Sequence, residues 1–224
     1  MRPPGAVVFD FDGLILDTEW TGYLSTSAVF EAHGEELSLE LWRSFVGTTD
    51  HPHWADILEE QLGRPVDRAH WMPRRVADGL ARARRLDLCE GVGPLVEALA
   101  GAGVPMGVAS SSRGEWVWTH LDERGLSPAF SAVCTGEEVE RTKPDPALYL
   151  LACERLGVAP GDAVALEDSV LGVRAAKSAG MAAVAVPSRL TASMDFSEAD
   201  LVVGSCAELD PAGLGRAVAR NING

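Results

Sequence analysis

The chain has few cysteines, and none of them stands in the C-x-x-C spacing of a zinc site or a redox-active dithiol. The four are Cys89, Cys134, Cys153 and Cys206. We interpret them as small buried residues of a protein in a reducing compartment. The sequence also lacks an apolar run of the roughly 18 residues that a membrane span needs, and it lacks the hydrophobic segment of a signal peptide. We therefore expect a cytoplasmic protein.

Basic residues are scarce as well, because 19 Lys and Arg face 33 Asp and Glu, for a net charge of -14. This excess of negative charge opposes binding to nucleic acid and to anionic membranes. The remaining composition, 46% hydrophobic and 23% charged, is typical of a globular protein with a substantial core. We expect a monomer that acts on a small molecule. An anionic substrate would need local positive charge or a metal ion at its site.

Six short apolar runs predict buried strands, at 6–9, 104–109, 132–134, 163–166, 182–186 and 201–203. Between them lie helical patterns that each stop at a glycine, the usual helix terminator; these patterns cover 92–102, 115–124, 146–156 and 169–179. Strands that alternate with helices indicate a parallel sheet with right-handed crossovers. We therefore predict an α/β protein with a Rossmann-like, doubly wound parallel sheet.

One segment breaks this alternation, since it shows helical periodicity and no strand. Its predicted helices are separated by Gly or Pro and cover 18–32, 39–46, 53–62 and 67–85. We predict a core domain of 1–16 and 87–224 with an inserted all-helical cap domain of 17–86, which would lie over the carboxyl edge of the sheet. We interpret four tryptophans of the insert as the core of the cap rather than a platform for substrate: Trp20, Trp42, Trp54 and Trp71.

Two aspartates follow the first predicted strand. Asp10 and Asp12 are two residues apart in an extended run, which points both side chains to the same side, and Gly13 then lets the backbone turn sharply. Two carboxylates at one mouth are costly unless a cation joins them or one is protonated. The pair is therefore either a Mg²⁺ site or an acid/base pair in which one carboxylate attacks phosphorus and the other handles a proton. A turn with two solvated acids is the alternative without function.

The sequence DFDGLILDTE at 10–19 resembles the first motif of the haloacid dehalogenase superfamily. The branch that it is similar to carries a helical cap after this motif, as do β-phosphoglucomutases and many sugar-phosphate phosphatases. The resemblance covers essentially the whole chain, because three further motifs follow in order. It implies that Asp10 is the nucleophile. It also implies that Asp12 is the general acid/base and places its backbone carbonyl on Mg²⁺.

The second and third motifs supply polar groups for a phosphoryl group. The segment ASSS at 109–112 places a hydroxyl at a strand end, where hydroxyl and backbone N–H groups suit a phosphoryl oxygen. The resemblance implies that Ser110 and Ser111 bind phosphate, whereas Ser112 is expected to cap the helix that follows. In RTKPDP at 141–146, it implies that Lys143 neutralises the phosphoryl group and Asp10.

The fourth motif is LEDSVLGV at 166–173. Carboxylate oxygens suit octahedral Mg²⁺, and the resemblance implies that Asp168 binds the metal and that Glu167 binds it directly or through water. Ser169 is expected to cap the helix that ends near Gly180. The alternative is that Asp168 merely caps this helix.

The residues at three positions distinguish between the reactions known in the superfamily. The dehalogenases lack an acidic residue where this chain has Asp12, which favours phosphoryl transfer. β-Phosphoglucomutases carry a His where Gly22 stands and an Arg where Asp50 stands. We therefore predict a Mg²⁺-dependent phosphatase that acts on a small phosphorylated metabolite, a sugar phosphate, through an aspartyl phosphate. The alternatives are a β-phosphoglucomutase-like phosphotransferase and a non-catalytic binding protein on the same scaffold.

Specificity is expected to come from the cap. Thr48 and His51 are predicted to contact the substrate, and further candidates are Trp20, Tyr23, Thr49, His53 and Trp54, with Arg74 or Arg75 as anion contacts. Arg141 is a second candidate cation beside Lys143.

Overall fold

The computed structural model describes residues 2–46 and 51–223. A single sheet of six parallel strands, in the order β3-β2-β1-β4-β5-β6, forms the α/β part. The strands are β1 (Ala6–Phe9), β2 (Met106–Ser110), β3 (Ala132–Thr135), β4 (Ala163–Glu167), β5 (Ala182–Ala185) and β6 (Leu201–Val202). Each lies at the apolar run that predicts it, so the predicted doubly wound parallel sheet is confirmed.

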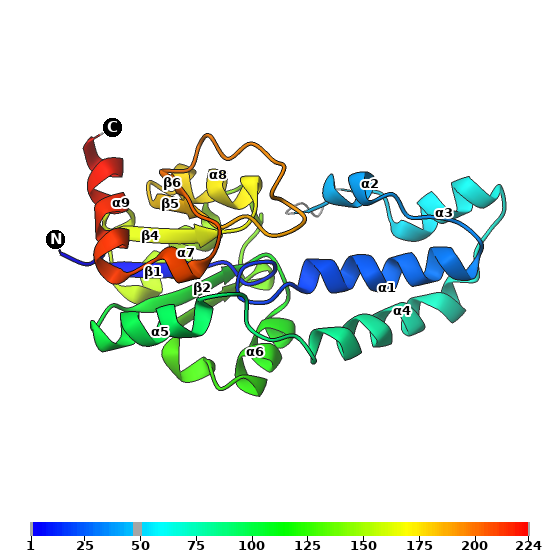
Figure 1. Cartoon of the computed structure of the whole chain (residues 1–224), viewed down its shortest axis with the longest axis horizontal. Helices are drawn as coiled ribbons and strands as arrows, with labels where there is room; N and C mark the ends of the chain where they lie inside the picture. The colour runs from blue at the N-terminus through cyan, green and yellow to red at the C-terminus, as the bar shows by residue number, and fades with distance from the viewer. Residues whose placement is uncertain (1, 47–50, 224) are drawn as a thin grey trace.

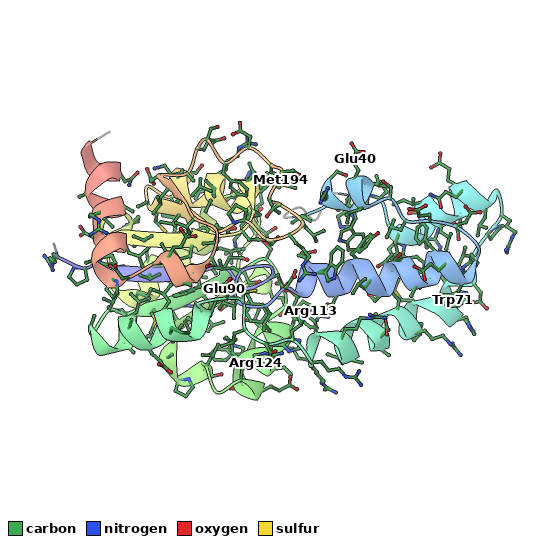
Figure 2. All side chains as sticks on the ribbon, viewed as in Figure 1. Glu40, Trp71, Glu90, Arg113, Arg124 and Met194 are labelled. Carbon is green, nitrogen blue, oxygen red and sulfur yellow. The ribbon has the colours of Figure 1, made fainter. Side chains whose placement is uncertain are left out.

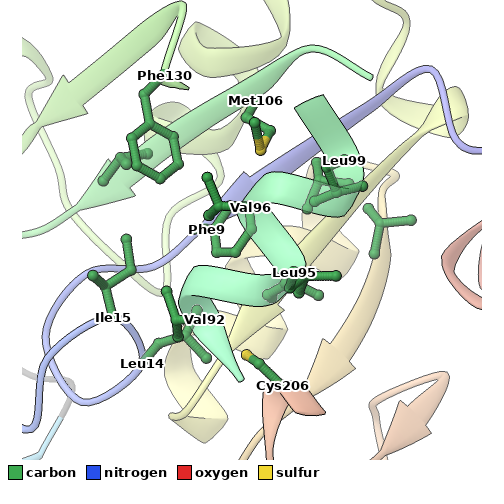
Figure 3. Close-up of a cluster of buried hydrophobic side chains, with 14 of the residues drawn as sticks. Phe9, Leu14, Ile15, Val92, Leu95, Val96, Leu99, Met106, Phe130 and Cys206 are labelled. Atoms are coloured by element: carbon green, nitrogen blue, oxygen red, sulfur yellow. The ribbon is translucent and has the colours of Figure 1, made fainter. Parts of the chain in front are cut away.

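Helices cover both faces of the sheet. On one face lie α5 (Val92–Gly101), α6 (Gly114–Glu123) and α9 (Pro211–Asn223), and on the other lie α7 (Ala147–Leu156) and α8 (Val170–Ser178). Successive side chains of a strand alternate between faces, so Phe9 packs against α5 (Figure 3), whereas Val8 faces α7 and α8. None of the described helices is long and apolar enough to cross a membrane.

A helical segment is inserted after β1, as the sequence predicts. It contains α1 (Thr18–Ala32), α2 (Leu39–Arg43), α3 (Trp54–Leu62) and α4 (Arg68–Ala83). Figure 1 shows it beyond the carboxyl ends of the strands, with α1 and α4 side by side. We call this segment the cap; its limits at 17 and 86 stay a prediction.

Three of the four tryptophans belong to the core of the cap, as predicted. Trp54 is a member of its buried apolar cluster, and Trp42 and Trp71 pack against that cluster. The prediction is wrong for Trp20, which is outside the cluster. The guanidinium of Arg189, from the loop after β5, lies 5.0 Å from the centroid of the Trp20 ring.

The strand order determines where a ligand can enter. β1 lies between β2 and β4, so the chain moves to one side of β1 first and to the other side later. In α/β sheets the crevice at this reversal, outside the carboxyl ends of the strands, is the usual ligand site. Asp10 directly follows β1 and Glu167 ends β4, so both predicted acidic motifs reach this crevice.

Candidate active site

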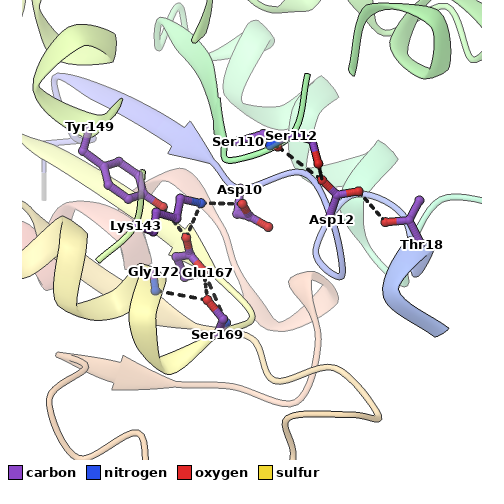
Figure 4. A network of polar contacts seen from close by, with 10 residues as sticks. All are labelled: Asp10, Asp12, Thr18, Ser110, Ser112, Lys143, Tyr149, Glu167, Ser169 and Gly172. Atoms are coloured by element: carbon purple, nitrogen blue, oxygen red, sulfur yellow. Dashed lines mark hydrogen bonds and ion pairs between the residues drawn. The ribbon is translucent and has the colours of Figure 1, made fainter. Parts of the chain in front are cut away.

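The loops of all four sequence motifs meet at this crevice (Figure 4). Together with the start of α1 they enclose a cavity of about 150 Å³, which we call the inner cavity. Side chains from all four motifs line it, as do two residues of the cap: Asp10, Asp12, Glu19, Val46, Ser110, Ser111, Ser112, Lys143, Asp168 and Ser169. The structure thus brings together every core residue that was predicted to act on the phosphoryl group, with Glu167 directly behind Lys143.

Lys143 joins the first and fourth motifs. Its Nζ donates to Asp10 Oδ1 and, at 2.6 Å, to Glu167 Oε1. Burial alone would lower the pKa of Lys143, but the two carboxylates outweigh it and raise this pKa, so the ammonium stays charged. Burial raises the pKa of Asp10 to about 8; the ion pair with Lys143 opposes this rise, and the charges of Glu167 and Asp12 add to it. A further cation would therefore favour ionised Asp10.

Glu167 is fully buried and accepts four hydrogen bonds. Besides Lys143, its donors are Tyr149 Oη at 2.6 Å and the backbone N and Oγ of Ser169 at 3.2 and 3.0 Å. Ser169 also caps α8 by accepting from Gly172 N at 3.0 Å, which confirms the predicted cap. A Cβ on Gly172 would lie 1.9 Å from the carboxyl carbon of Glu167. The start of α8 is therefore shaped around this carboxylate.

Asp10, Glu167 and Asp168 form a cluster of buried carboxylates whose oxygens lie within 4.8 Å of one another. Lys143 supplies one positive charge against three carboxyl groups, and burial, together with Asp10 and Glu167, raises the pKa of Asp168 well above its usual range. Asp168 Oδ2 is buried, and it has no hydrogen-bond partner among the residues that the structure describes. An unpaired oxygen in an oxygen-only, anionic cluster is what a hard divalent cation such as Mg²⁺ requires. The residues present therefore fit a metal ion.

Gly13 makes room for this unpaired oxygen. Its φ is +94°, a conformation that favours glycine, and a Cβ there would lie 2.1 Å from Asp168 Oδ2. The expectation that Gly13 allows a sharp turn is confirmed. The turn also places the backbone of the first motif against the metal cluster.

Asp12 lies apart from this cluster and accepts four hydrogen bonds of its own. Oδ1 accepts from Thr18 Oγ1 at 2.6 Å and Trp116 Nε1 at 2.9 Å, and Oδ2 accepts from Ser112 Oγ at 2.6 Å and Ser110 Oγ at 3.2 Å. The expected cap by Ser112 is wrong, since α6 begins after Arg113 with no side-chain cap. The Ser112 hydroxyl is instead committed to Asp12.

Two further hollows continue from the inner cavity toward the cap. The middle hollow, about 430 Å³, lies between α1, α4 and the loop after β2; it includes Asp12, Ser111 and Trp116 as well as Arg113, which Figure 2 shows at the junction of core and cap. The distal hollow, about 390 Å³, lies inside the cap. Glu19 lines the inner cavity and both hollows, and Arg75 lines both hollows.

The cap residues that were predicted to contact the substrate differ in where they lie. Thr48 and Thr49 lie outside the described residues. His51 is exposed, its ring stacks on Phe45 at a centroid distance of 4.8 Å, and it lines the distal hollow rather than the inner cavity. Its contact with substrate stays a prediction.

Two of the candidate cations lie outside the three hollows. Arg74 is exposed and donates to the carbonyl of His70, and Arg141 is exposed and pairs with Asp145.

Three side chains at the site were not singled out from the sequence. Tyr149 holds Glu167, Trp116 holds Asp12, and Glu19 faces all three spaces. Burial, and then the charges of Asp12 and Asp17, raises the pKa of Glu19 to about 7. Tyr149 and Trp116 lie on helices without a motif. Glu19 is part of the first motif, but nothing in the sequence shows which way its side chain points.

Comparison with known proteins gives the same picture. The family of haloacid dehalogenase-like hydrolases matches residues 7–186. "Putative phosphatase YhcW" of Bacillus subtilis is 40% identical over 205 residues, 92% of this chain and 93% of that protein. The "Phosphorylated carbohydrates phosphatase" of Thermotoga maritima is 32% identical over 181 residues, 79% of this chain and 82% of that protein.

A solved structure with a similar fold contains a bound ligand. CbbY from Rhodobacter sphaeroides, a mutant in complex with xylulose-(1,5)-bisphosphate, superposes with a TM-score of 0.76 at 28% identity, over 94% of this chain and 99% of that one. The fold and the site therefore define a capped α/β phosphatase. The chain belongs to the haloacid dehalogenase-like hydrolases and is related to the CbbY and β-phosphoglucomutase branch with a cap domain.

Proposed function

We propose that the protein is a Mg²⁺-dependent phosphomonoester phosphatase that acts on a small phosphorylated metabolite, a sugar phosphate, through an aspartyl phosphate. The observation that carries this proposal is that two carboxyl groups at one cavity have different surroundings. Asp10 is buried beside an ammonium and a cluster fit for a metal ion, whereas Asp12 is surrounded by hydrogen-bond donors. The first environment suits a nucleophile and the second suits an acid/base.

The chemistry follows from these positions. An Asp10 oxygen attacks phosphorus in line, and the bond to the leaving oxygen breaks as Asp12 gives that oxygen a proton. Asp12 then takes a proton from water, whose oxygen attacks the phosphorus of the aspartyl phosphate and releases inorganic phosphate and Asp10. Lys143 and Ser110 hold the phosphoryl oxygens throughout. These are the roles that the sequence motifs imply for Asp10, Asp12, Ser110 and Lys143.

The proton of Asp12 has a defined place. Its Oδ1 accepts from the indole N–H of Trp116, which can only donate. Among the described residues, its Oδ2 is hydrogen-bonded only to the hydroxyls of Ser110 and Ser112, and a hydroxyl can reverse and accept. We therefore assign the proton to Oδ2.

Asp10, Asp168 and the backbone carbonyl of Asp12 would hold the metal ion. Both oxygens of Glu167 already accept two hydrogen bonds each, which favours contact through water over direct ligation. When bound, Mg²⁺ would neutralise charge on the phosphoryl oxygens and on Asp10.

The test is release of inorganic phosphate from a panel of sugar phosphates and p-nitrophenyl phosphate, with Mg²⁺ and with EDTA, beside Asp10→Asn. Release that needs both Mg²⁺ and Asp10 is expected. Release that persists in EDTA or in a folded Asp10→Asn variant would refute the mechanism. Conversion of a sugar phosphate into its isomer without net release would instead support a phosphotransferase.

A further inference from the structure

His120 is a histidine of α6 that has no part in the proposed mechanism, and it is fully buried. Burial, and then the charge of Arg124, lowers the pKa of His120 against the opposing charges of Glu123 and Asp12, so the imidazole is uncharged at neutral pH. Among the described residues, its Nε2 has no hydrogen-bond partner, and a buried polar group without a partner is destabilising. An apolar ring would fill the same space at lower cost. Packing alone therefore does not explain a histidine at this position.

The ring of His120 packs against two supports of Asp12. It stacks on Phe11, with 6.4 Å between ring centroids and 21° between ring planes, and Phe11 lies between Asp10 and Asp12 in the first motif. It also forms a T-shaped pair with the Trp116 ring, at 4.3 Å and 83°. The Trp116 indole N–H donates to Asp12 Oδ1 at 2.9 Å. A shift of the imidazole would therefore disturb both the backbone and the donor that hold Asp12 in place.

Arg124, which directly follows α6, fixes the imidazole. Its Nη1 donates to His120 Nδ1 at 3.3 Å and to the His120 carbonyl at 3.2 Å. Since a guanidinium can only donate, Nδ1 is the acceptor. Its Nη2 donates to the carbonyls of Ala83 and Leu86 at 2.8 and 2.9 Å, so the guanidinium is itself held in place. Glu123 Oε2 lies 3.8 Å from Nη1 and 3.5 Å from His120 Nδ1.

We propose that His120 is a positioning residue for Asp12, the acid and base of the proposed function, on which this inference rests. Arg124 sets the orientation of the imidazole, and the imidazole keeps the Trp116 indole and the Phe11 backbone where they hold the Asp12 carboxyl group. Because Trp116 holds Oδ1, it also aims Oδ2, which carries the proton, at the leaving oxygen. A displacement of about 1 Å, even one caused far from the reacting atoms, can cost roughly 100-fold in rate. The support behind Asp12 therefore decides how well the leaving group is protonated.

Leaving groups of different basicity test this role. A sugar alkoxide needs a proton in order to leave, whereas p-nitrophenolate is a weak base and leaves without one. We would measure kcat/KM for p-nitrophenyl phosphate and for the fastest sugar phosphate of the panel. His120→Phe keeps an aromatic ring and removes Nδ1, and Arg124→Lys keeps the charge but loses the planar fork of donors. Arg84→Ala is the control, because Arg84 pairs with the same Glu123, at 3.4 Å, and is exposed.

The two substrates should respond differently. His120→Phe and Arg124→Lys are each expected to lower kcat/KM for the sugar phosphate by about 10- to 100-fold, and for p-nitrophenyl phosphate by about 2-fold at most. His120→Phe should also keep or gain stability toward urea, because it removes the unpartnered N–H. Arg84→Ala should change neither kcat/KM value. Equal losses for both substrates, or no loss for either in His120→Phe, would overturn the proposal, because His120 would then only fill space.

A double-mutant cycle tests whether Arg124 acts through the indole. Among the described residues, no hydrogen bond joins Arg124 to Trp116, and His120 contacts both. Arg124→Lys should therefore cost much less for the sugar phosphate in a Trp116→Phe background than in the wild type, because residues that act through one another are not additive. An equal cost in both backgrounds would contradict the link.

An NMR spectrum keeps this proposal apart from the proposed function. With the indole nitrogens isotopically labelled, the signal that disappears in Trp116→Phe identifies the Trp116 N–H. That signal should shift in Arg124→Lys and stay in place in Arg84→Ala. A shift supports the chain of contacts from Arg124 to Asp12 even if no ester is hydrolysed, in which case only the proposed phosphatase fails. Hydrolysis of esters with an unmoved signal in Arg124→Lys would leave the phosphatase and overturn the positioning role.

Discussion

Among the described residues, most polar side chains of the sheet end have hydrogen-bond partners, with Asp168 Oδ2 as the exception, whereas several buried donors of the cap have none. At the sheet end, Glu167 and Asp12 each accept four hydrogen bonds. In the described part of the cap, no acceptor lies within hydrogen-bond distance of the indole N–H groups of Trp42 and Trp54 or of the Nε of Arg75. A group that must be preorganised for every turnover is held by the protein itself.

Asp10 gives the largest expected effect. Asp10→Asn removes the nucleophile, so turnover should fall by at least about 10³-fold. The fold should persist, because Lys143 keeps its ion pair with Glu167. Phosphate release and urea unfolding measure the two quantities. The exposed Asp87→Asn serves as control, and activity near that of the wild type in Asp10→Asn would end the assignment.

Gly172 tests how tightly the sheet end is built. In Gly172→Ala the new Cβ would collide with Glu167, so we expect a loss of about 1 to 3 kcal/mol in the free energy of unfolding and a lower kcat. Gly101→Ala is the matched control, since nothing lies within 4 Å of a Cβ on that other helical glycine, and it should be neutral or stabilising by up to about 1 kcal/mol. Equal stabilities of the two variants would show that the surroundings of Glu167 accommodate the added methyl group.

Trp116 tests the hydrogen bonds of Asp12 with a smaller change. Trp116→Phe keeps an aromatic ring and removes the N–H donor to Asp12 Oδ1, and loss of a hydrogen bond to a charged group corresponds to a roughly 10-fold lower kcat. Trp118→Phe, two residues along the same helix and exposed, should leave kcat unchanged. A kcat of Trp116→Phe equal to that of Trp118→Phe would mean that the Trp116 ring only fills space.

Glu19, which lies on the cap side of the site, gives the smallest expected effect. Its pKa is raised to about 7, so the folded protein keeps a proton that the unfolded chain has already lost between about pH 4.5 and pH 7. Over that interval Glu19 lowers stability as the pH rises, and the loss is complete above pH 7. Glu19→Gln should therefore gain stability relative to the wild type at pH 8 and gain less at pH 5, as measured by urea unfolding. Glu31→Gln, exposed on the same helix, should show no such difference; a pH-independent gain in Glu19→Gln would contradict the raised pKa.

Much of the fold could be predicted from local patterns. The six strands are short apolar runs, and the expected limits of α1, Thr18–Ala32, agree with the structure. Helix α9 was missed, because glycines at 213 and 215 weaken its helical signal. It is stabilised by packing, since Leu214 and Ala217 are buried against the sheet. Trp20 was misplaced because a helical pattern does not reveal that the loop after β5 supplies a cation to that ring.

The four motifs were determined by the sequence alone, because a polar cluster that follows a buried parallel strand must lie at the carboxyl edge of the sheet. That is enough to predict Asp10 and Asp168 at one site, whereas Lys143, which stands well beyond the end of β3, was placed there by the resemblance to the haloacid dehalogenase superfamily. Which side chains complete the site was decided only by the tertiary structure. Trp116 donates to Asp12 across 104 residues of chain. Glu19 of α1 and Arg75 of α4 line the same two hollows. Such pairings depend on how each helix is rotated and packed, which no local pattern in the chain records.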